Sequence, residues 1–344
     1  MSLPLPVVGA VQPVDGALVD RFGRRHTYLR VSVTDRCNYR CVYCMPKEGL
    51  DWLPRADLLS FEEIERIAAV FVRNGVTRIR LTGGEPTVRR GLPDLVKRLG
   101  ALPGLTDLAM TTNGHAFAPM ATRLADAGLR RINVSIDALD PSLFSELTRG
   151  GNVAKVLDAI AAARAAGIVP IKLNCVVLRG RNESEVASLV EAFAPHAADT
   201  VVRFIEYMPF DGNDARRHHV PVAEIRERLA QRFGLVPSDA PRHGGPAKLY
   251  TVPSTGQLVG FISPITEHFC EACNRLRLSA DGHLRTCLSR DKMPSLREGL
   301  RAGWTDAELE TALRGAVWNK VAGHEAHLVE GARAFEGVMT RVGG

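Results

Sequence analysis

Short segments rich in β-branched residues alternate with segments of helical periodicity through the first two thirds of the chain. After residue 60, for example, apolar residues recur three or four positions apart and form one stripe. This alternation predicts an α/β fold with a parallel sheet and right-handed crossovers. Six strands are expected, near residues 28–34, 77–82, 107–112, 130–136, 171–177 and 201–207.

Local signals mark the ends of several helices. Ser60 and Glu63 have the spacing of a capping box, and Gly75 is typical of a helix end. Asp140 followed by Pro141 predicts an N-cap with proline at the first helical position. Further helices are expected over residues 152–166 and 182–194.

Polar residues gather where the predicted strands end. In a βα barrel the carboxyl ends of the strands converge on one mouth, so these residues would form one site. A doubly wound sheet gathers them less evenly, and periodicity does not decide between the two. The residues are Cys37, 83–86, 111–114, 135–137, Lys172, Asn174 and 206–208.

Several of these residues also have a purely structural interpretation. Residues 83–86 are typical of a tight turn, Lys172 of an exposed edge position and Met208 of core packing. Cys175 lies in an apolar strand and is expected to be a buried core thiol. The sequence has no Walker A or G-x-G-x-x-G motif, so a nucleotide would depend on scattered Arg and Lys residues.

The pattern changes after residue 236. Residues 237–248 are rich in Pro, Gly and Ser, which predicts a linker or surface loop. We therefore divide the chain into a barrel-like region, 1–236, and a C-terminal region, 237–344.

Composition narrows the class of partner. Of the 344 residues, 45% are hydrophobic and 24% charged, as in ordinary globular proteins. The net charge of +6 favours an anionic partner, but only 6% of residues are aromatic. Because these do not interleave with a basic run, a small anionic substrate is expected rather than nucleic acid. The first ten residues predict neither a signal peptide nor a membrane span, and a cytoplasmic location is expected.

Most of the seven cysteines fall into two groups, which favours metal ligation over disulfides. The first group, Cys37, Cys41 and Cys44, has the spacing C-x3-C-x2-C. Three thiolates hold three irons of a four-iron cluster and leave the fourth iron open for chemistry. The alternative is a structural zinc site, which needs a fourth ligand at short range, and the next histidine, His115, is distant.

The second group is Cys270, Cys273 and Cys287. Alternating residues after Cys273 and the pair Asp281-Gly282 predict a hairpin that brings Cys287 back toward Cys273. A two-residue loop would pair Leu276 with Cys287, whereas a three-residue loop would pair Arg277 with Cys287. We predict the loop of odd length, or a bulge.

Arg275 and Arg277 share a strand face with Cys273 in this hairpin. Two guanidinium groups beside an open cluster suit an anion or the edge of a purine. A zinc ribbon completed by His268 or His283 is the alternative.

Longer segments around these residues match a known family. On them the sequence resembles the radical S-adenosylmethionine (SAM) superfamily and, within it, the GTP 3′,8-cyclases of molybdenum cofactor biosynthesis. The resemblance runs from about Asp20 to the last residue. The matching segments are 28–46, 82–87, 131–138, 203–208 and 269–282.

The resemblance implies an incomplete (β/α)6 TIM-like barrel whose open side the C-terminal region closes. It also implies that a [4Fe-4S] cluster on the first cysteine set binds SAM and, when reduced, releases methionine and a 5′-deoxyadenosyl radical. The SAM contacts that it implies are Tyr43, Gly84, Glu85, Ser135 and Met208.

By the same resemblance, a second [4Fe-4S] cluster on Cys270, Cys273 and Cys287 binds the guanine of GTP. The radical takes the ribose 3′ hydrogen, and the sugar radical attacks C8 to give 3′,8-cyclo-7,8-dihydro-GTP. The implied catalytic residues are Arg275, Arg277, Gly343 and Gly344. The implied substrate contacts are Arg30, Arg80, Thr111, Lys172, Arg275, Leu276 and Arg277.

The resemblance also implies partners for the reaction. These are a flavodoxin or ferredoxin as electron donor, cyclic pyranopterin monophosphate synthase as recipient of the product, and a second copy in a homodimer. Two alternatives stay open at this point. One is another radical SAM enzyme with an auxiliary cluster, acting on a peptide or RNA, and the other is a non-catalytic zinc-binding protein.

Overall fold

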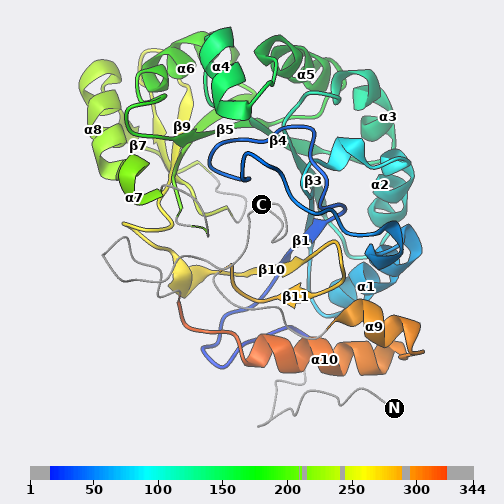
Figure 1. Cartoon of the computed structure of the whole chain (residues 1–344). Helices are drawn as coiled ribbons and strands as arrows, with labels where there is room; N and C mark the ends of the chain where they lie inside the picture. Colours follow the sequence, from blue (N-terminus) through cyan, green and yellow to red (C-terminus); the bar gives the residue numbers. More distant parts are fainter. Residues whose placement is uncertain (1–15, 209, 211–214, 241–244, 289–294, 324–344) are drawn as a thin grey trace.

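A single sheet organises the computed structural model, which describes residues 16–208, 210, 215–240, 245–288 and 295–323. The sheet has 11 strands in the order β11-β10-β1-β2-β3-β4-β5-β6-β9-β8-β7 (Figure 1). The six predicted strands are confirmed as its parallel centre. They are β1 (Tyr28–Ser32), β2 (Arg78–Thr82), β3 (Asp107–Thr112), β4 (Arg131–Ser135), β5 (Ile171–Val177) and β6 (Thr200–Glu206).

The order of these strands distinguishes a barrel from a doubly wound sheet. A doubly wound sheet reverses its order at a switch point, whereas β1 to β6 follow one another in sequence. Within the described chain, the edge strands β11 and β7 do not pair with each other, so the barrel is not closed. The predicted incomplete (β/α)6 barrel is therefore confirmed.

Helices cover the outer face of the central strands (Figure 1). The predicted capping box of α1 is present, since Ser60 Oγ accepts from the Glu63 amide at 3.1 Å and Glu63 accepts from the Ser60 amide at 2.7 Å. Asp140 caps α4 as predicted. The helices between the strands are α1 (Phe61–Arg73), α2 (Leu92–Gly100), α3 (Ala121–Asp126), α4 (Pro141–Thr148), α5 (Val153–Ala165) and α6 (Glu185–Phe193).

The C-terminal region adds strands to both edges of the central sheet. At one edge β10 (Arg275–Leu278) pairs parallel with β1 and carries β11 (Leu284–Arg285). At the other edge β9 (Leu258–Ile262) pairs parallel with β6, followed by β8 (Lys248–Thr251) and β7 (Val236–Pro237). The division of the chain at residue 236 stays a prediction.

The described residues after β6 form the helices α7 (Ala215–His218), α8 (Val222–Phe233), α9 (Leu296–Arg301) and α10 (Asp306–Trp318). Helices α9 and α10 both pack against α1 at the outside of the barrel. No helix in the described part of the chain is both long enough and apolar enough to cross a bilayer.

Alternation along the strands separates the core from the inside of the barrel. Leu29 and Val31 of β1 are fully buried in the core, whereas Arg30 lines the central cavity. In β5, Cys175 is 1% exposed and belongs to the core, which confirms its predicted role, while Lys172 lines the cavity. One face of each strand is thus apolar and the other carries the polar groups of the site.

The β10–β11 hairpin differs from its predicted register. Arg277 lies opposite Arg285, so the predicted pairing of Arg277 with Cys287 is wrong. The loop begins one residue earlier because Gly282, with φ 83°, takes its last position, and the Ser279 amide closes it on the His283 carbonyl at 2.9 Å. The loop is still of odd length, as predicted, and Cys287 lines the cavity beside Arg277.

Glu206, at the end of β6, connects the barrel to the C-terminal region. Its carboxylate is 1% exposed. It accepts hydrogen bonds from the amides of Val222, Ile265 and Thr266, each at 3.0 Å, and from the Thr266 hydroxyl. One side chain therefore satisfies backbone donors of α8 and of the segment after β9.

We expect Glu206→Ala to lower the free energy of unfolding by about 3 kcal/mol, because one buried and two partly buried N–H groups lose their acceptor. Urea denaturation followed by circular dichroism measures this change. Glu191→Ala, which removes an exposed ion pair with Arg232, is the matched control and should change stability by less than about 1 kcal/mol. Equal effects of the two substitutions would contradict the role of Glu206.

Candidate active site

One cavity joins the inner face of the sheet to the C-terminal region. It encloses about 360 Å³, within the range of ligand pockets. Both cysteine sets face it, although more than 200 residues separate them in the sequence. The cysteines are Cys37, Cys41, Cys44, Cys270, Cys273 and Cys287.

These cysteines suit iron–sulfur clusters better than single metal ions. Among the residues that the structure describes, no group of three His, Cys, Asp or Glu side chains forms a site for one metal ion. A four-iron cluster has its irons at alternate corners of a cube and one thiolate on each, so the thiolates lie farther apart than the ligands of one zinc ion. The described arrangement therefore disfavours the zinc alternatives.

The first cysteine set lies in the loop that follows β1. The amide of Cys44 donates to the carbonyl of Cys41 at 3.0 Å. Cys37 Sγ accepts from the Tyr39 amide at 3.4 Å and from the side-chain amide of Asn113 at 3.8 Å. The loop therefore holds its own shape and is also attached to the end of β3.

Gly84 lets the turn after β2 pack directly on the cysteine loop. The Gly84 amide donates to the Thr34 carbonyl, and the Glu85 amide donates to the Arg36 carbonyl, each at 2.8 Å. A Cβ at position 84 would overlap the Arg36 carbonyl, so only glycine permits this approach. Gly84 thus shapes the loop that carries the first cysteine set.

Glu85 has a buried carboxylate that the surrounding residues fully engage. It accepts from the amide and hydroxyl of Thr87 at 3.0 and 2.6 Å, from the Thr112 hydroxyl at 2.7 Å and from the Asn113 amide at 2.6 Å. Burial nevertheless raises the pKa of this carboxyl. The side chain holds the turn against β3, so a SAM contact at this position falls to its backbone.

Tyr43 is held by a carboxylate whose role the sequence did not reveal. The Tyr43 hydroxyl donates to Asp137 Oδ2 at 2.8 Å, and the Val176 amide donates to Asp137 Oδ1 at 2.9 Å. Burial raises the pKa of Asp137 to about 6. Asp137 therefore fixes Tyr43, a predicted SAM contact, in the cavity wall.

The two cysteine sets have opposite electrostatic environments. Burial, assisted by the charge of Glu85, raises the pKa of Cys37 to about 11. Burial also acts to raise the pKa of Cys273, but the charges of Arg275 and Lys320 outweigh it and lower that pKa to about 6. Cys273 is thus poised as thiolate beside cations, whereas Cys37 must lose its proton when it binds iron.

Three arginines form a row across neighbouring strands on the inner face. Arg30 of β1 lies opposite Arg277 of β10 on one side and opposite Arg80 of β2 on the other. Burial and the charge of Arg277 lower the pKa of Arg30. Burial and the charge of Arg275 lower the pKa of Arg277 to about 10. An anionic ligand in the cavity would offset the mutual repulsion of this row.

Cations exceed free carboxylates around the cavity. The lining carboxylates are engaged elsewhere: Asp107 pairs with Arg131, and Glu85, Asp137 and Glu206 accept the hydrogen bonds given above. The lining cations are Arg30, Arg80, Arg131, Lys172, Arg203, Arg275 and Arg277.

Two buried polar atoms point to a ligand. Arg30 Nε and Thr111 Oγ1 have no hydrogen-bond partner among the described residues. Unsatisfied buried donors are rare in folded proteins and each calls for an explanation. Both residues were predicted as substrate contacts.

Lys172 is not an exposed edge residue. It lies in β5, between β4 and β6, and lines the cavity. Burial, followed by the charges of Arg203, Arg131 and Arg80, lowers its pKa to about 7. The structural interpretation of Lys172 is therefore wrong, whereas its predicted place at the substrate site is consistent with this geometry.

The structure gathers most of the predicted site residues. Ser135 and Met208 line the same cavity as the cysteines. The Leu276 side chain is fully buried in the core on the other face of β10, so only its backbone is available to a substrate. Gly343 and Gly344 lie outside the described residues.

Sequence reasoning missed four residues around the cavity: Tyr28, Arg203, Asp137 as the support of Tyr43, and Lys320. Tyr28 accepts a hydrogen bond from Arg80 Nε, and Arg203 donates to Asn174 Oδ1 at 2.9 Å. Tyr28 and Arg203 alternate with core residues in their strands, and this alternation in the sequence could have identified them as cavity residues. Lys320 contacts Cys273 Sγ at 3.6 Å, and no local pattern predicts that contact.

Together, the open βα barrel and the three-cysteine loop at its mouth define a radical SAM protein. The model of the radical SAM superfamily matches residues 31–193, and that of Molybdenum Cofactor Synthesis C matches residues 200–326. Membership of this superfamily implies one [4Fe-4S] cluster and SAM, and the first cysteine set fits that role.

Curated relatives narrow the assignment. A GTP 3′,8-cyclase of Pelotomaculum thermopropionicum is 44% identical over 328 residues, covering 94% of this chain and 99% of the relative. That of Paracoccus denitrificans is 46% identical with 90% of each chain covered. The mitochondrial enzyme of Arabidopsis thaliana is 43% identical, covering 96% of this chain and 85% of the relative. This chain belongs to the GTP 3′,8-cyclase family.

A solved structure supports the fold. SuiB of Streptococcus suis bound to S-adenosylmethionine superposes with a TM-score of 0.61 at 17% identity, covering 86% of this chain and 69% of that one. At this identity the likeness shows the shared architecture alone.

We expect Gly84→Ala to lower the iron content by about four atoms per chain, because the added Cβ displaces the loop that carries the first cysteine set. Iron and sulfide analysis after anaerobic reconstitution measures the loss. Cys37→Ala gives the reference value for an empty first site. Full iron content in Gly84→Ala would contradict the packing argument.

Proposed function

We propose that this chain converts GTP to 3′,8-cyclo-7,8-dihydro-GTP, the first step of molybdenum cofactor biosynthesis, and that it carries two [4Fe-4S] clusters. One observation carries the proposal: both cysteine sets and a row of three neighbouring arginines face the same cavity. Membership of the GTP 3′,8-cyclase family supports the reaction.

SAM bound at the first cluster supplies the 5′-deoxyadenosyl radical that removes the ribose 3′ hydrogen. Cys37, Cys41 and Cys44 would hold this cluster. Tyr43, Ser135 and Met208, together with the backbone of Gly84 and Glu85, would line the SAM position. Their part is to hold the adenosyl group still and to keep water away from the reacting carbon.

Cys270, Cys273 and Cys287 would hold the second cluster, next to Arg275 and Arg277. The arginine row, Thr111 and Lys172 would bind the triphosphate and the ribose. Guanidinium groups suit this task because they make paired hydrogen bonds to phosphate oxygens. Fixed at both ends, GTP would present C3′ and C8 to each other.

The charge of the cavity argues against a peptide as substrate. A main-chain segment offers no negative charge to the arginine row, whereas a triphosphate does. We further propose a flavodoxin or ferredoxin as electron donor, cyclic pyranopterin monophosphate synthase as recipient of the product, a homodimer and a cytoplasmic location.

An anaerobic assay with SAM, reductant and each nucleoside triphosphate in turn tests the reaction. We expect GTP alone to yield both 5′-deoxyadenosine and, after acid treatment, a fluorescent pterin. Arg277→Ala should weaken GTP binding about 30-fold or more, since it removes a buried charge-assisted contact. If 5′-deoxyadenosine forms with no product that depends on GTP, the substrate assignment fails while the SAM half of the site stands.

The lowered pKa of Lys172 predicts a pH-dependent affinity. Above pH 7 the free side chain loses its proton, so a triphosphate that requires the ammonium form must bind with proton uptake. Between pH 7 and 9 the affinity for GTP should fall by up to about tenfold per pH unit. Calorimetry at pH 8 in buffers of different ionisation enthalpy, without reductant, measures the protons taken up.

Lys172→Met should bind GTP more weakly at pH 7 and remove most of this proton uptake. The proton uptake of the variant is compared with that of the wild type, because the terminal phosphate of GTP also titrates in this pH range. Lys155→Met, on the exposed side of α5, controls for the loss of one positive charge. Equal proton uptake in wild type and Lys172→Met would rule out the role of Lys172.

A further inference from the structure

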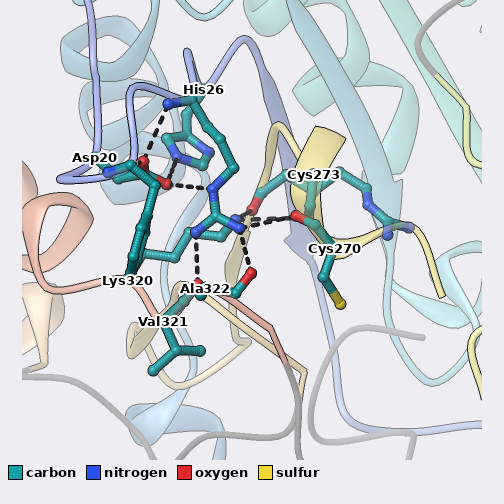
Figure 2. A network of polar contacts seen from close by, with 10 residues as sticks. Asp20, His26, Cys270, Cys273, Lys320, Val321 and Ala322 are labelled. Atoms are coloured by element: carbon teal, nitrogen blue, oxygen red, sulfur yellow. Dashed lines mark hydrogen bonds and ion pairs between the residues drawn. The ribbon is translucent and has the colours of Figure 1, made fainter.

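Three segments that are far apart in the sequence meet behind the second cysteine set (Figure 2). Arg24 donates from Nη1 to the carbonyls of Cys270 at 2.8 Å and Ala322 at 2.7 Å, and from Nη2 to the carbonyl of Val321 at 2.5 Å. Its Nε donates to Asp20 at 2.7 Å. One guanidinium group thus joins the segment before β1, the cysteine loop and the segment after α10.

Asp20 keeps this guanidinium group in place. Its carboxylate, 2% exposed, also accepts from the amides of Phe22 at 2.9 Å and Arg24 at 3.0 Å and contacts His26 Nε2 at 2.9 Å. With so many partners, Asp20 and Arg24 form a rigid support for the cysteine loop.

Lys320 directs a second cation at this loop. It is 2% exposed, and Nζ donates to the Arg275 carbonyl at 2.7 Å and lies 3.6 Å from Cys273 Sγ, within hydrogen-bonding distance for sulfur. In the described part of the chain it forms no ion pair with a carboxylate. A buried ammonium group without a counter-charge is costly, and a thiolate that ligates a cluster would supply the missing charge.

We propose that Lys320 is a positioning residue that raises the reduction potential of the second cluster through its hydrogen bond to Cys273. This role rests on the proposed function, because it requires that cluster. Reduction adds negative charge to a cluster, and a nearby cation or an N–H group directed at a ligating sulfur stabilises the reduced form. Arg24, by holding the Cys270 backbone, keeps the distance between Lys320 and the cluster constant.

Redox titration of the reconstituted full-length chain, followed by electron paramagnetic resonance without SAM or GTP, tests this role. Lys320→Met removes the charge and the donor at similar length, and Lys320→Arg keeps both. Lys155→Met is the matched control, with the same substitution on the exposed side of α5. Cys273→Ala identifies which signal belongs to the second cluster.

We expect Lys320→Met to keep about eight irons per chain and to shift only the second signal, toward a more negative potential. The potential of this signal in Lys320→Arg should lie closer to that of the wild type, and the potential in Lys155→Met should equal that of the wild type. Loss of the second set of irons in Lys320→Met but not in Lys320→Arg also supports the role, since the charge is then what the cluster requires.

Two results overturn the role of Lys320 while the second cluster stands: an unchanged potential in Lys320→Met, or loss of the second irons in both Lys320 variants. A shift of equal size in Lys155→Met overturns it as well, because net charge alone then explains the effect. If the wild type holds only about four irons, or Cys273→Ala leaves the iron content unchanged, the proposed second cluster itself fails and this inference falls with it.

Discussion

Arg277, Arg30 and Arg80 lie side by side on β10, β1 and β2, and the inner face of the sheet is organised around their mutual repulsion. Like charges directly opposite each other destabilise a sheet, and burial adds to the cost. The opposite face of the same strands offsets this cost, since Leu29 and Leu276 are fully buried in the core. The fold therefore maintains a charge pattern that an anion in the cavity would relieve.

The two cysteine sets differ from each other in their electrostatic surroundings. In the first set, burial and the charge of the neighbouring Glu85 raise the pKa of Cys37. Arg275 and Lys320 make the second set electropositive and lower the pKa of Cys273. Positive charge around the second set would suit a cluster that faces a polyanionic substrate. A cluster on the first set would not need this positive charge. One cavity can thus hold two clusters with different roles.

Much of this arrangement could be predicted from the sequence, for identifiable reasons. Segments rich in β-branched residues alternate with helical segments along the chain, and the Ser60 capping box is a local signal, so the strands β1 to β6 and this capping box were found. Contacts between distant segments were not. Lys320 reaches Cys273 only through the path of the chain after α10, and Asp137, which follows β4, supports Tyr43 in the loop after β1 across 94 residues of sequence. The hairpin register failed because a left-handed Gly282 moved the loop by one residue.

The position of β10 explains why the chain needs its C-terminal region to complete the site. Strand β10 pairs with β1 across nearly 250 residues of sequence, and only this pairing brings Arg277 into register with Arg30. The same region is attached at the other edge of the sheet, where Glu206 holds the segment after β9. Neither the barrel nor the C-terminal region contains a complete anion site by itself. Because the site exists only where both regions meet, a change that loosens either edge of the sheet acts on substrate binding as well as on stability.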